Sequence, residues 1–290
     1  MEESGLRRTI AKVASLKGRG LHSGRAVSLC VRPGPIGSGI TFRIPEAGAE
    51  GEFPARLSSV VDDRNATSLG PGAYRVSTVE HLLACTSMLG LDDLILEIEG
   101  GEPPAVDGSA APLFDGLAAG GSCDTAGERH VVRLVEEVTF RQGEVEVHAV
   151  PAPVFGVDYT IDFDAEAIGR QTISFPRIDG PVFQREIAPA RTFGFLRDLD
   201  TLRAAGLAGG ASLDNVVVVD GAEILNESGL RWPDEFVRHK VLDLVGDLAL
   251  LGAPVRGHFH VVRGGHAAHH GWLRALQDRP DAWRLEKERS

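Results

Sequence analysis

The sequence of 290 residues predicts an α+β protein, in which helices and strands are layered without a regular βαβ alternation. Segments 92–100, 143–150 and 157–163 alternate apolar and polar residues, which is typical of half-buried strands. A helical spacing of apolar residues instead predicts helices within residues 77–90, 111–120, 195–207, 234–252 and 266–278. Both patterns recur along the chain, which favours mixed layers over a doubly wound parallel sheet.

A stretch of glycine and other small residues at 118–128 is the strongest candidate for a domain boundary. It predicts an N-terminal α+β domain at 1–126 and a C-terminal α+β domain at 127–290. A chain of this length can bury a full core without disulfides. The three cysteines lie far apart in the sequence, which predicts packed thiols rather than a disulfide framework.

Composition and charge exclude several classes of function. A net charge of -11 has the wrong sign for a nucleic-acid-binding protein, although a local basic pocket for a phosphate-bearing small molecule stays open. No segment approaches the roughly 18 apolar residues that a membrane-spanning helix needs. The N-terminal segment lacks the continuous apolar core of a secretory signal. We therefore expect a protein without a membrane span and with a cytoplasmic location.

The helix predicted at 234–251 carries a stripe of polar residues. It follows Pro233, begins with two acidic residues and runs without a breaker up to Gly252. The stripe is formed by residues four apart: His239, Asp243 and Asp247. Side chains at this spacing are about 5–6 Å apart at Cβ, close enough for an imidazole and a carboxylate to bind one ion. A solvated helix face would show the same stripe, so both interpretations stay open at this point.

The motif STVEHLLA places an acid beside a histidine at the start of a predicted helix. Ser77 followed by Glu80 before an apolar run fits a capping box, in which the glutamate folds back onto the serine backbone. The other interpretation is a general base beside a metal-binding His81. Catalytic zinc has three protein ligands and one open position, so His81 could complete a site with His239 and Asp243. Spacing alone does not join residues so far apart in the sequence.

Six segments of the chain carry a family resemblance: residues 18–24, 77–84, 106–117, 190–199, 234–248 and 264–270. Together they resemble, in order and spacing, the zinc-dependent UDP-3-O-acyl-N-acetylglucosamine deacetylases of lipid A biosynthesis. The resemblance implies two similar βααβ-type layered domains, with helices packed between sheets and the active site between the domains. It also implies a hydrolase that converts UDP-3-O-acyl-N-acetylglucosamine to UDP-3-O-acyl-glucosamine and acetate, the committed step of lipid A and hence lipopolysaccharide synthesis.

The resemblance further implies a metal centre. His81, His239 and Asp243 would bind one zinc ion (Zn²⁺) per chain, although these ligands also suit Fe²⁺ in the cell. Glu80 would be the general base that activates water. Two neutral imidazoles and one carboxylate leave a bound zinc ion with net positive charge, which lowers the pKa of its water toward about 7.

Four more residues are implied in catalysis by the same resemblance. A protonated His266, held by Asp247, would assist the oxyanion or the leaving amine. Thr192 would help to polarise the amide carbonyl. Lys240 would meet a phosphate or sugar oxygen of the nucleotide.

Substrate-binding residues are implied mainly in the second half of the chain. The uridine and sugar would lie near Asp162 and Phe163, and Arg263 stands where the family has a cation for the diphosphate. Segment 191–215 matches the family insert that forms a hydrophobic acyl passage, with three lining candidates: Phe193, Phe195 and Leu207. His22 matches a family position near the metal, although a turn residue would be unremarkable in its glycine-bounded loop.

The remaining histidines receive a structural interpretation. After His266 and Ala267 the family commonly has Leu-Asn, and the Ala268 and His269 found here could loosen the seating of His266. His269 and His270 are expected on the helix surface. Two more, His258 and His260, alternate in a predicted strand and so point to one side, but no third partner is suggested. We expect a satisfied or solvent-facing pair.

Two alternatives to this deacetylase remain. One is a paralogous zinc deacetylase that acts on another N-acetylated sugar. The other is a catalytically silent metal- or nucleotide-binding homologue, against which the intact set of polar site residues argues. For the enzyme we expect a monomer whose partner is a UDP-linked acylated amino-sugar.

Overall fold

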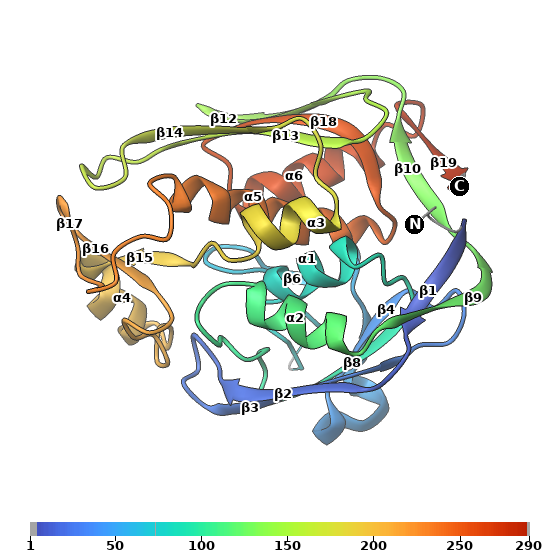
Figure 1. The fold of residues 1–290 in the computed structure, drawn as a ribbon, viewed down its shortest axis with the longest axis horizontal. Helices are drawn as coiled ribbons and strands as arrows, with labels where there is room; N and C mark the ends of the chain where they lie inside the picture. The colour runs from blue at the N-terminus through green and yellow to red at the C-terminus, as the bar shows by residue number, and fades with distance from the viewer. Residues whose placement is uncertain (1–4, 73, 289–290) are drawn as a thin grey trace.

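The computed structural model describes residues 5–72 and 74–288 and confirms the α+β class. Two sheets lie on the outside of the molecule, and the main helices lie between them (Figure 1). Residues 1–4 lie outside the described residues. They are the first part of the N-terminal segment that is predicted to lack a secretory signal. Within the described ranges, no helix combines the length and the apolar character needed to cross a membrane.

The first sheet has five strands in the order β2-β3-β8-β4-β5. Their bounds are Ala14–Arg19 (β2), Ala26–Pro33 (β3), Leu94–Glu99 (β8), Ile40–Arg43 (β4) and Glu52–Pro54 (β5). In β8 the apolar side chains of Leu94, Leu96 and Ile98 are fully buried, while the alternate side chains point outward. This period of two lets one face of the sheet pack against helices α1 (Glu80–Met88) and α2 (Ala111–Ala119).

The second sheet has seven strands and takes most of the C-terminal half of the chain. Its bounds are Val138–Gln142 (β11), Val145–Val150 (β12), Val255–Val262 (β18), His130–Leu134 (β10), Trp283–Lys287 (β19), Phe155–Asp162 (β13) and Arg170–Phe175 (β14). Strand β18 is central, because it pairs with β12 in antiparallel and with β13 and β10 in parallel orientation. The inner face of this second sheet is covered by α5 (Glu235–Leu248) and α6 (His266–Gln277).

A small third sheet projects at one end of the layers, beside helix α4 (Figure 1). Its strands are Phe193–Phe195 (β15), Val217–Asp220 (β16) and Glu223–Ile224 (β17). Of the helix predicted at 195–207, residues 196–204 are helical, as the turn η4 (Leu196–Asp198) followed by α4 (Leu199–Ala204), while Phe195 pairs with β16. Tertiary strand pairing thus sets the start of the helical segment.

Short elements complete the chain. Two-stranded pairs are formed by Leu6–Ile10 (β1) with Ser122–Glu128 (β9), and by Val60–Asp62 (β6) with Ser68–Leu69 (β7). The remaining helical turns are Pro45–Gly51 (η1), Leu57–Ser59 (η2), Gly180–Val182 (α3), Phe183–Ile187 (η3), Leu196–Asp198 (η4) and Ala249–Leu251 (η5). The division into domains 1–126 and 127–290, and their likeness as βααβ units, stay predictions; the proposed cut falls inside β9.

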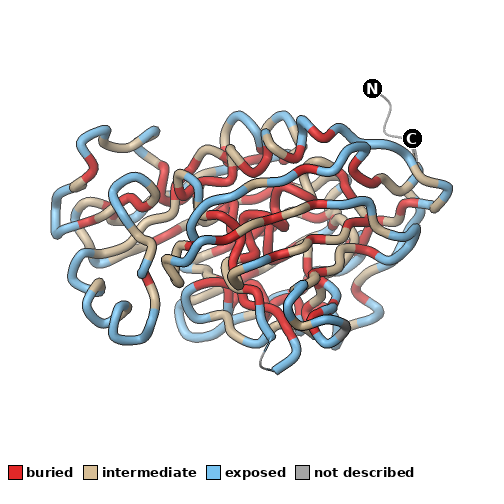
Figure 2. Tube along the Cα trace, turned by 90° about the horizontal axis from the view of Figure 1, so that it is seen from below, coloured by how far each residue is buried: buried red, intermediate tan, exposed pale blue. Residues whose placement is uncertain are grey.

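Helices α1 and α5 cross at the centre of the molecule. A Cβ atom at Gly246 of α5 would lie only 2.0 Å from the backbone oxygen of Glu80 at the start of α1. Only glycine therefore permits this close approach. The buried parts of the chain gather in the middle of the molecule, and the exposed parts form the periphery (Figure 2). The polar stripe of α5 consequently lies inside the protein.

Candidate metal centre

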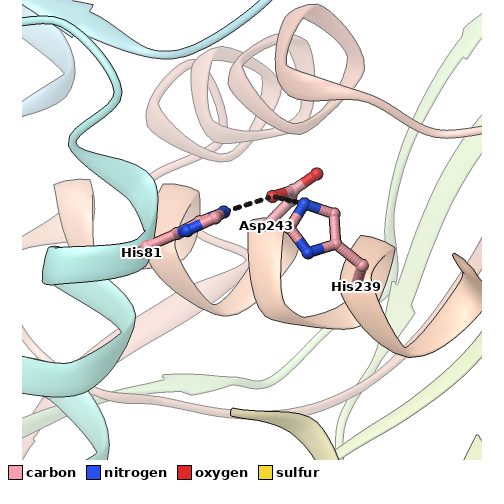
Figure 3. A group of neighbouring side chains, drawn as sticks. All are labelled: His81, His239 and Asp243. Carbon is pink, nitrogen blue, oxygen red and sulfur yellow. Dashed lines mark ion pairs between the residues drawn. The ribbon is translucent and has the colours of Figure 1, made fainter. Parts of the chain in front are cut away.

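The crossing of α1 and α5 brings together the three residues expected to bind metal. His81 comes from α1, and His239 and Asp243 come from successive turns of α5 (Figure 3). Asp243 Oδ1 lies 3.7 Å from His81 Nε2 and 3.4 Å from His239 Nε2. All three side chains are buried, and their ligand atoms converge closely enough to hold one ion. Their function as ligands stays a prediction.

Neighbouring groups prepare His239 and Asp243 for metal binding. The backbone oxygen of Ala190 lies 3.1 Å from His239 Nδ1, so Nδ1 donates and Nε2 keeps its lone pair. Burial lowers the pKa of His239 to about 4, which keeps the ring neutral. Burial raises the pKa of Asp243, but nearby cations, Lys240 foremost, hold it well below its usual range. The pair thus offers a neutral imidazole and a carboxylate, the protonation states that a metal requires.

Glu80 faces the candidate metal centre and does not cap its helix. Its Oε2 accepts a hydrogen bond from the backbone N–H of Thr67 at 3.1 Å, and Oε1 lies 3.9 Å from His266 Nε2. Helix α1 begins at Glu80 itself, after Val79, and no side chain caps it. Ser77 instead receives a hydrogen bond from Ser68. The capping-box interpretation is therefore wrong. Burial raises the pKa of Glu80, as suits a base that accepts a proton.

His266 begins helix α6 and joins the same buried cluster. Its Nδ1 lies 2.8 Å from Asp247 Oδ2, and its Nε2 lies 4.0 Å from Asp243 Oδ2. Burial lowers the pKa of His266, but Asp247, Glu80 and Asp243 outweigh burial and raise the pKa to about 10. The imidazole is therefore protonated at neutral pH. The candidate base Glu80 and the candidate acid His266 therefore stand side by side.

Asp247 lies at the centre of this cluster and is completely buried. Besides His266, it accepts a hydrogen bond from Thr67 Oγ1 at 2.6 Å. His269 Nδ1 lies 2.8 Å from Oδ2, and His270 Nε2 lies 3.3 Å from Oδ1. These partners outweigh the effect of burial, and they hold the pKa of Asp247 well below its usual range. An ionised carboxylate thus orients the ring of His266.

The expectation that His269 and His270 lie on the helix surface is wrong, since both are fully buried. The hydroxyl of Tyr159 lies 3.0 Å from His269 Nε2, and Asp63 Oδ2 lies 3.1 Å from His270 Nδ1. Each ring thus has a partner on both nitrogen atoms. Helical spacing in the sequence could have predicted their burial, because both residues share one face of α6 with the apolar Leu273.

Comparison with known proteins shows which family this chain is part of. A model of the family described as UDP-3-O-acyl N-acetylglycosamine deacetylase matches residues 7–278. The chain belongs to this family.

Named relatives agree with the family match over nearly the whole chain. The UDP-3-O-acyl-N-acetylglucosamine deacetylase of Myxococcus xanthus is 42% identical over 278 residues, which cover 96% of this chain and 88% of that protein. The protein of the same name from an Anaeromyxobacter species is 46% identical over 279 residues, with coverages of 96% and 90%. That of Phenylobacterium zucineum is 42% identical over 279 residues, with coverages of 96% and 95%. This deacetylase family is a family of metalloenzymes.

In this deacetylase-family chain, aromatic rings line one side of the candidate metal centre. Phe193 of β15 lies with its ring centroid 6.1 Å from that of His239 and 5.0 Å from that of Phe236. Phe163 packs against both Phe193 and Phe195, at centroid distances of 5.6 Å and 5.9 Å. These three predicted substrate-binding residues therefore form one apolar group. Within this group, the ring of Phe193 lies next to that of His239, a predicted metal ligand.

One predicted catalytic residue, Lys240, lies between this aromatic group and the candidate metal centre. Lys240 Nζ is 2.8 Å from Asp243 Oδ2 and 5.8 Å from the centre of the Phe193 ring. Burial lowers the pKa of Lys240, but Asp243 outweighs burial and raises it. Thr192 directly precedes Phe193, and its backbone bonds to Gly108 and Val217.

The other predicted substrate residues stand farther out. Arg263 follows β18 and pairs with Asp162 Oδ2 at 2.8 Å, as well as with Glu144. Leu207 is half-buried just after α4. His22 contacts the segment 208–210, where its backbone oxygen accepts from Gly209 at 2.8 Å. Segment 191–215, the predicted acyl passage, and the His22 loop thus touch one another.

Proposed function

We propose that this chain hydrolyses the N-acetyl group of UDP-3-O-acyl-N-acetylglucosamine, giving UDP-3-O-acyl-glucosamine and acetate in lipid A biosynthesis. The family membership and the names of the relatives support the substrate and the reaction. The observation that carries the chemistry is one buried cluster with three groups in different states. A metal-ligand set, a carboxylate with a raised pKa and a protonated imidazole converge where α1, α5 and α6 meet.

The donor set fits zinc, one ion per chain. His81, His239 and Asp243 offer two imidazole nitrogens and one carboxylate oxygen, and three protein ligands leave a position open for chemistry. When bound, such an ion supplies a Lewis acid that polarises the amide carbonyl and acidifies water. Fe²⁺ suits the same donors, so zinc is proposed from the family resemblance and not from the ligand set alone.

Glu80 and His266 divide the proton transfers between them. Glu80 takes a proton from the attacking water, which its raised pKa favours, because a stronger base binds the proton more firmly. His266 enters protonated and gives its proton to the leaving nitrogen, since an amine leaves far more readily than an amide anion. Asp247 holds the His266 ring in place at 2.8 Å. Thr192 is proposed to donate a hydrogen bond to the amide oxygen.

The remaining predicted residues are proposed to hold the substrate on two sides of this cluster. The 3-O-acyl chain would lie against Phe193 and Phe195, which pack on Phe163, and run toward Leu207. The nucleotide would lie toward Asp162 and Arg263, where a guanidinium can meet a diphosphate. Lys240 would exchange its bond to Asp243 for an oxygen of the sugar or phosphate. His22, which burial keeps neutral by lowering its pKa, borders the acyl side.

Two substitutions separate metal binding from proton transfer. Glu80→Gln should keep the metal and lower kcat by about 10²–10⁴-fold, the usual range for a lost general base. His81→Ala should lose both the metal and the activity. Metal content by elemental mass spectrometry and acetate release are measured on the same preparations. Glu166→Gln, at an exposed glutamate outside the cluster, is the matched control. A Glu80→Gln enzyme at full speed would overturn the mechanism.

Two measurements, of substrate preference and of metal content, distinguish the proposed function from its two alternatives. A UDP-N-acetylglucosamine without the 3-O-acyl chain should be hydrolysed far more slowly than the acylated form, whereas a paralogue for another sugar would show no such preference. A protein without metal, whose activity no added metal restores, would support the silent homologue. A monomeric state and a cytoplasmic location stay predictions.

A further inference from the structure

A second group of metal-ligating side chains lies on the outer face of the second sheet, away from α5 and α6. It consists of Asp158 on β13 and of His258 and His260 on β18. The two strands run in parallel, and Asp158 stands directly beside His260 in the register. Phe259, between the two histidines, is buried against Trp272 of α6 on the inner face. The histidines therefore point outward, on the side of the sheet opposite to the candidate metal centre.

The sequence suggested no third partner for this histidine pair, and the fold supplies one. Asp158 Oδ2 lies 3.0 Å from His258 Nε2 and 3.1 Å from His260 Nδ1. The three ligand atoms lie within 4.8 Å of one another. Ligands at about 2.1 Å from a zinc ion stand about 3.0–3.4 Å apart, depending on the angle between them. One ion could thus reach all three atoms with small side-chain movements.

The surroundings orient this group, as outer contacts do in metal sites. Ser174 Oγ on β14 donates a hydrogen bond to Asp158 Oδ1 at 2.5 Å, which leaves Oδ2 directed at the two imidazoles. Gly156 stands beside His258 in the register, and a Cβ atom there would lie 2.5 Å from His258 Nδ1. The absence of a side chain at Gly156 therefore makes room for the imidazole.

A further histidine closes the opposite side of the group. The ring of His148 on β12 stacks against that of His260, with centroids 5.9 Å apart. Thr139 Oγ1 lies 2.7 Å from His148 Nδ1 and holds the ring in this position. His260 is itself exposed, so the group is open to solvent and an ion can enter directly.

We propose that Asp158, His258 and His260 form a second binding site for a divalent transition-metal ion such as Zn²⁺, which links β13 to β18. Two imidazoles select such an ion over Mg²⁺ or Ca²⁺, which prefer oxygen ligands. The site is independent of the proposed deacetylase reaction, since the sheet separates it from Glu80 and His81. The ion joins neighbouring strands and does not take part in catalysis.

The test compares zinc binding by full-length protein that already carries its catalytic metal. Wild type and the His258→Ala/His260→Ala double variant are dialysed against the same buffered free Zn²⁺ and analysed by elemental mass spectrometry. The double variant should hold one zinc ion fewer per chain and keep its kcat. Any additional zinc bound at the catalytic residues cancels in the comparison, because those residues are identical in both proteins. His130→Ala, on another strand, should bind as wild type does.

Two single substitutions make the test specific for coordination. Asp158→Asn should also lose the additional zinc ion, because the amide removes the anionic ligand. Ser174→Ala should weaken zinc binding about tenfold, as expected when the partner that orients a ligand is lost. Zinc should raise the melting temperature of the wild type but not that of the double variant. Equal zinc contents in wild type and double variant would overturn the proposal and leave a simple His–Asp contact.

Discussion

Replacing Gly246 with alanine should disturb the candidate metal centre without changing any of its residues. The new methyl carbon would lie 2.0 Å from the backbone oxygen of Glu80, whereas ordinary contacts begin at 3.4 Å. Helices α1 and α5 must therefore separate by about 1 Å or more at the crossing, because neither backbone can bend away alone. His81 moves with α1, while His239 and Asp243 move with α5. The metal ligands are consequently pulled apart.

The size of the effect can be estimated from the two consequences of this movement. Overpacking costs about 3 kcal/mol at the upper end of its usual range. Alanine gains about 1 kcal/mol over glycine inside a helix, so the net loss of stability should be about 2 kcal/mol. A displacement of about 1 Å between catalytic groups lowers kcat about 100-fold. Activity should therefore fall much more than a loss of folded protein at 25 °C would explain.

Urea unfolding and steady-state acetate release would measure the two effects on the same preparation of Gly246→Ala. The matched control is Gly116→Ala in α2, where the new methyl group meets only the flexible end of Leu16 at 3.2 Å. That control should keep wild-type kcat and be at least as stable as the wild type, because alanine is favoured over glycine inside a helix. A Gly246→Ala protein with unchanged kcat and stability would refute the argument that this crossing sets the position of the ligands.

Two further predictions concern neighbouring contacts. Glu235 is fully buried and binds Arg191 through both carboxylate oxygens, at 2.8 Å and 3.0 Å. Glu235→Gln should lower the free energy of unfolding, measured in urea, by about 3 kcal/mol, because Arg191 loses its counter-charge. Burial raises the pKa of Glu235, but Arg191 outweighs burial and lowers it, so the pair stabilises the fold above the unfolded pKa of about 4.3. That contribution should disappear as pH falls through the lower folded pKa. The free energy of unfolding should therefore decrease less steeply with falling pH in the variant than in the wild type, and equal slopes would contradict this. Phe193→Ala should raise KM for the acylated substrate at least tenfold while the metal content is unchanged, and an unaltered KM would exclude Phe193 from the acyl side.

The sequence by itself determined the features that depend on near neighbours along the chain. The helical segment formed by α5 and η5 lies between Pro233 and Gly252, as the sequence predicts, and the i, i+4 spacing places His239 and Asp243 on one face of α5. The alternation in 92–100 and 157–163 likewise predicts β8 and β13 correctly. Backbone geometry and side-chain periodicity act over a few residues, so these features can be read locally.

Only the tertiary structure decided which distant groups meet. The direction of the Glu80 side chain depends on Thr67 and on the crossing of α1 with α5, and a capping box with the same letters would have turned it away. His269 and His270 are buried because Asp247 satisfies them, although their residue type predicts exposure. Asp158 completes the outer histidine group through strand pairing over about a hundred residues. Such contacts arise when the core packs, and residue type and spacing carry no record of the partner that packing supplies.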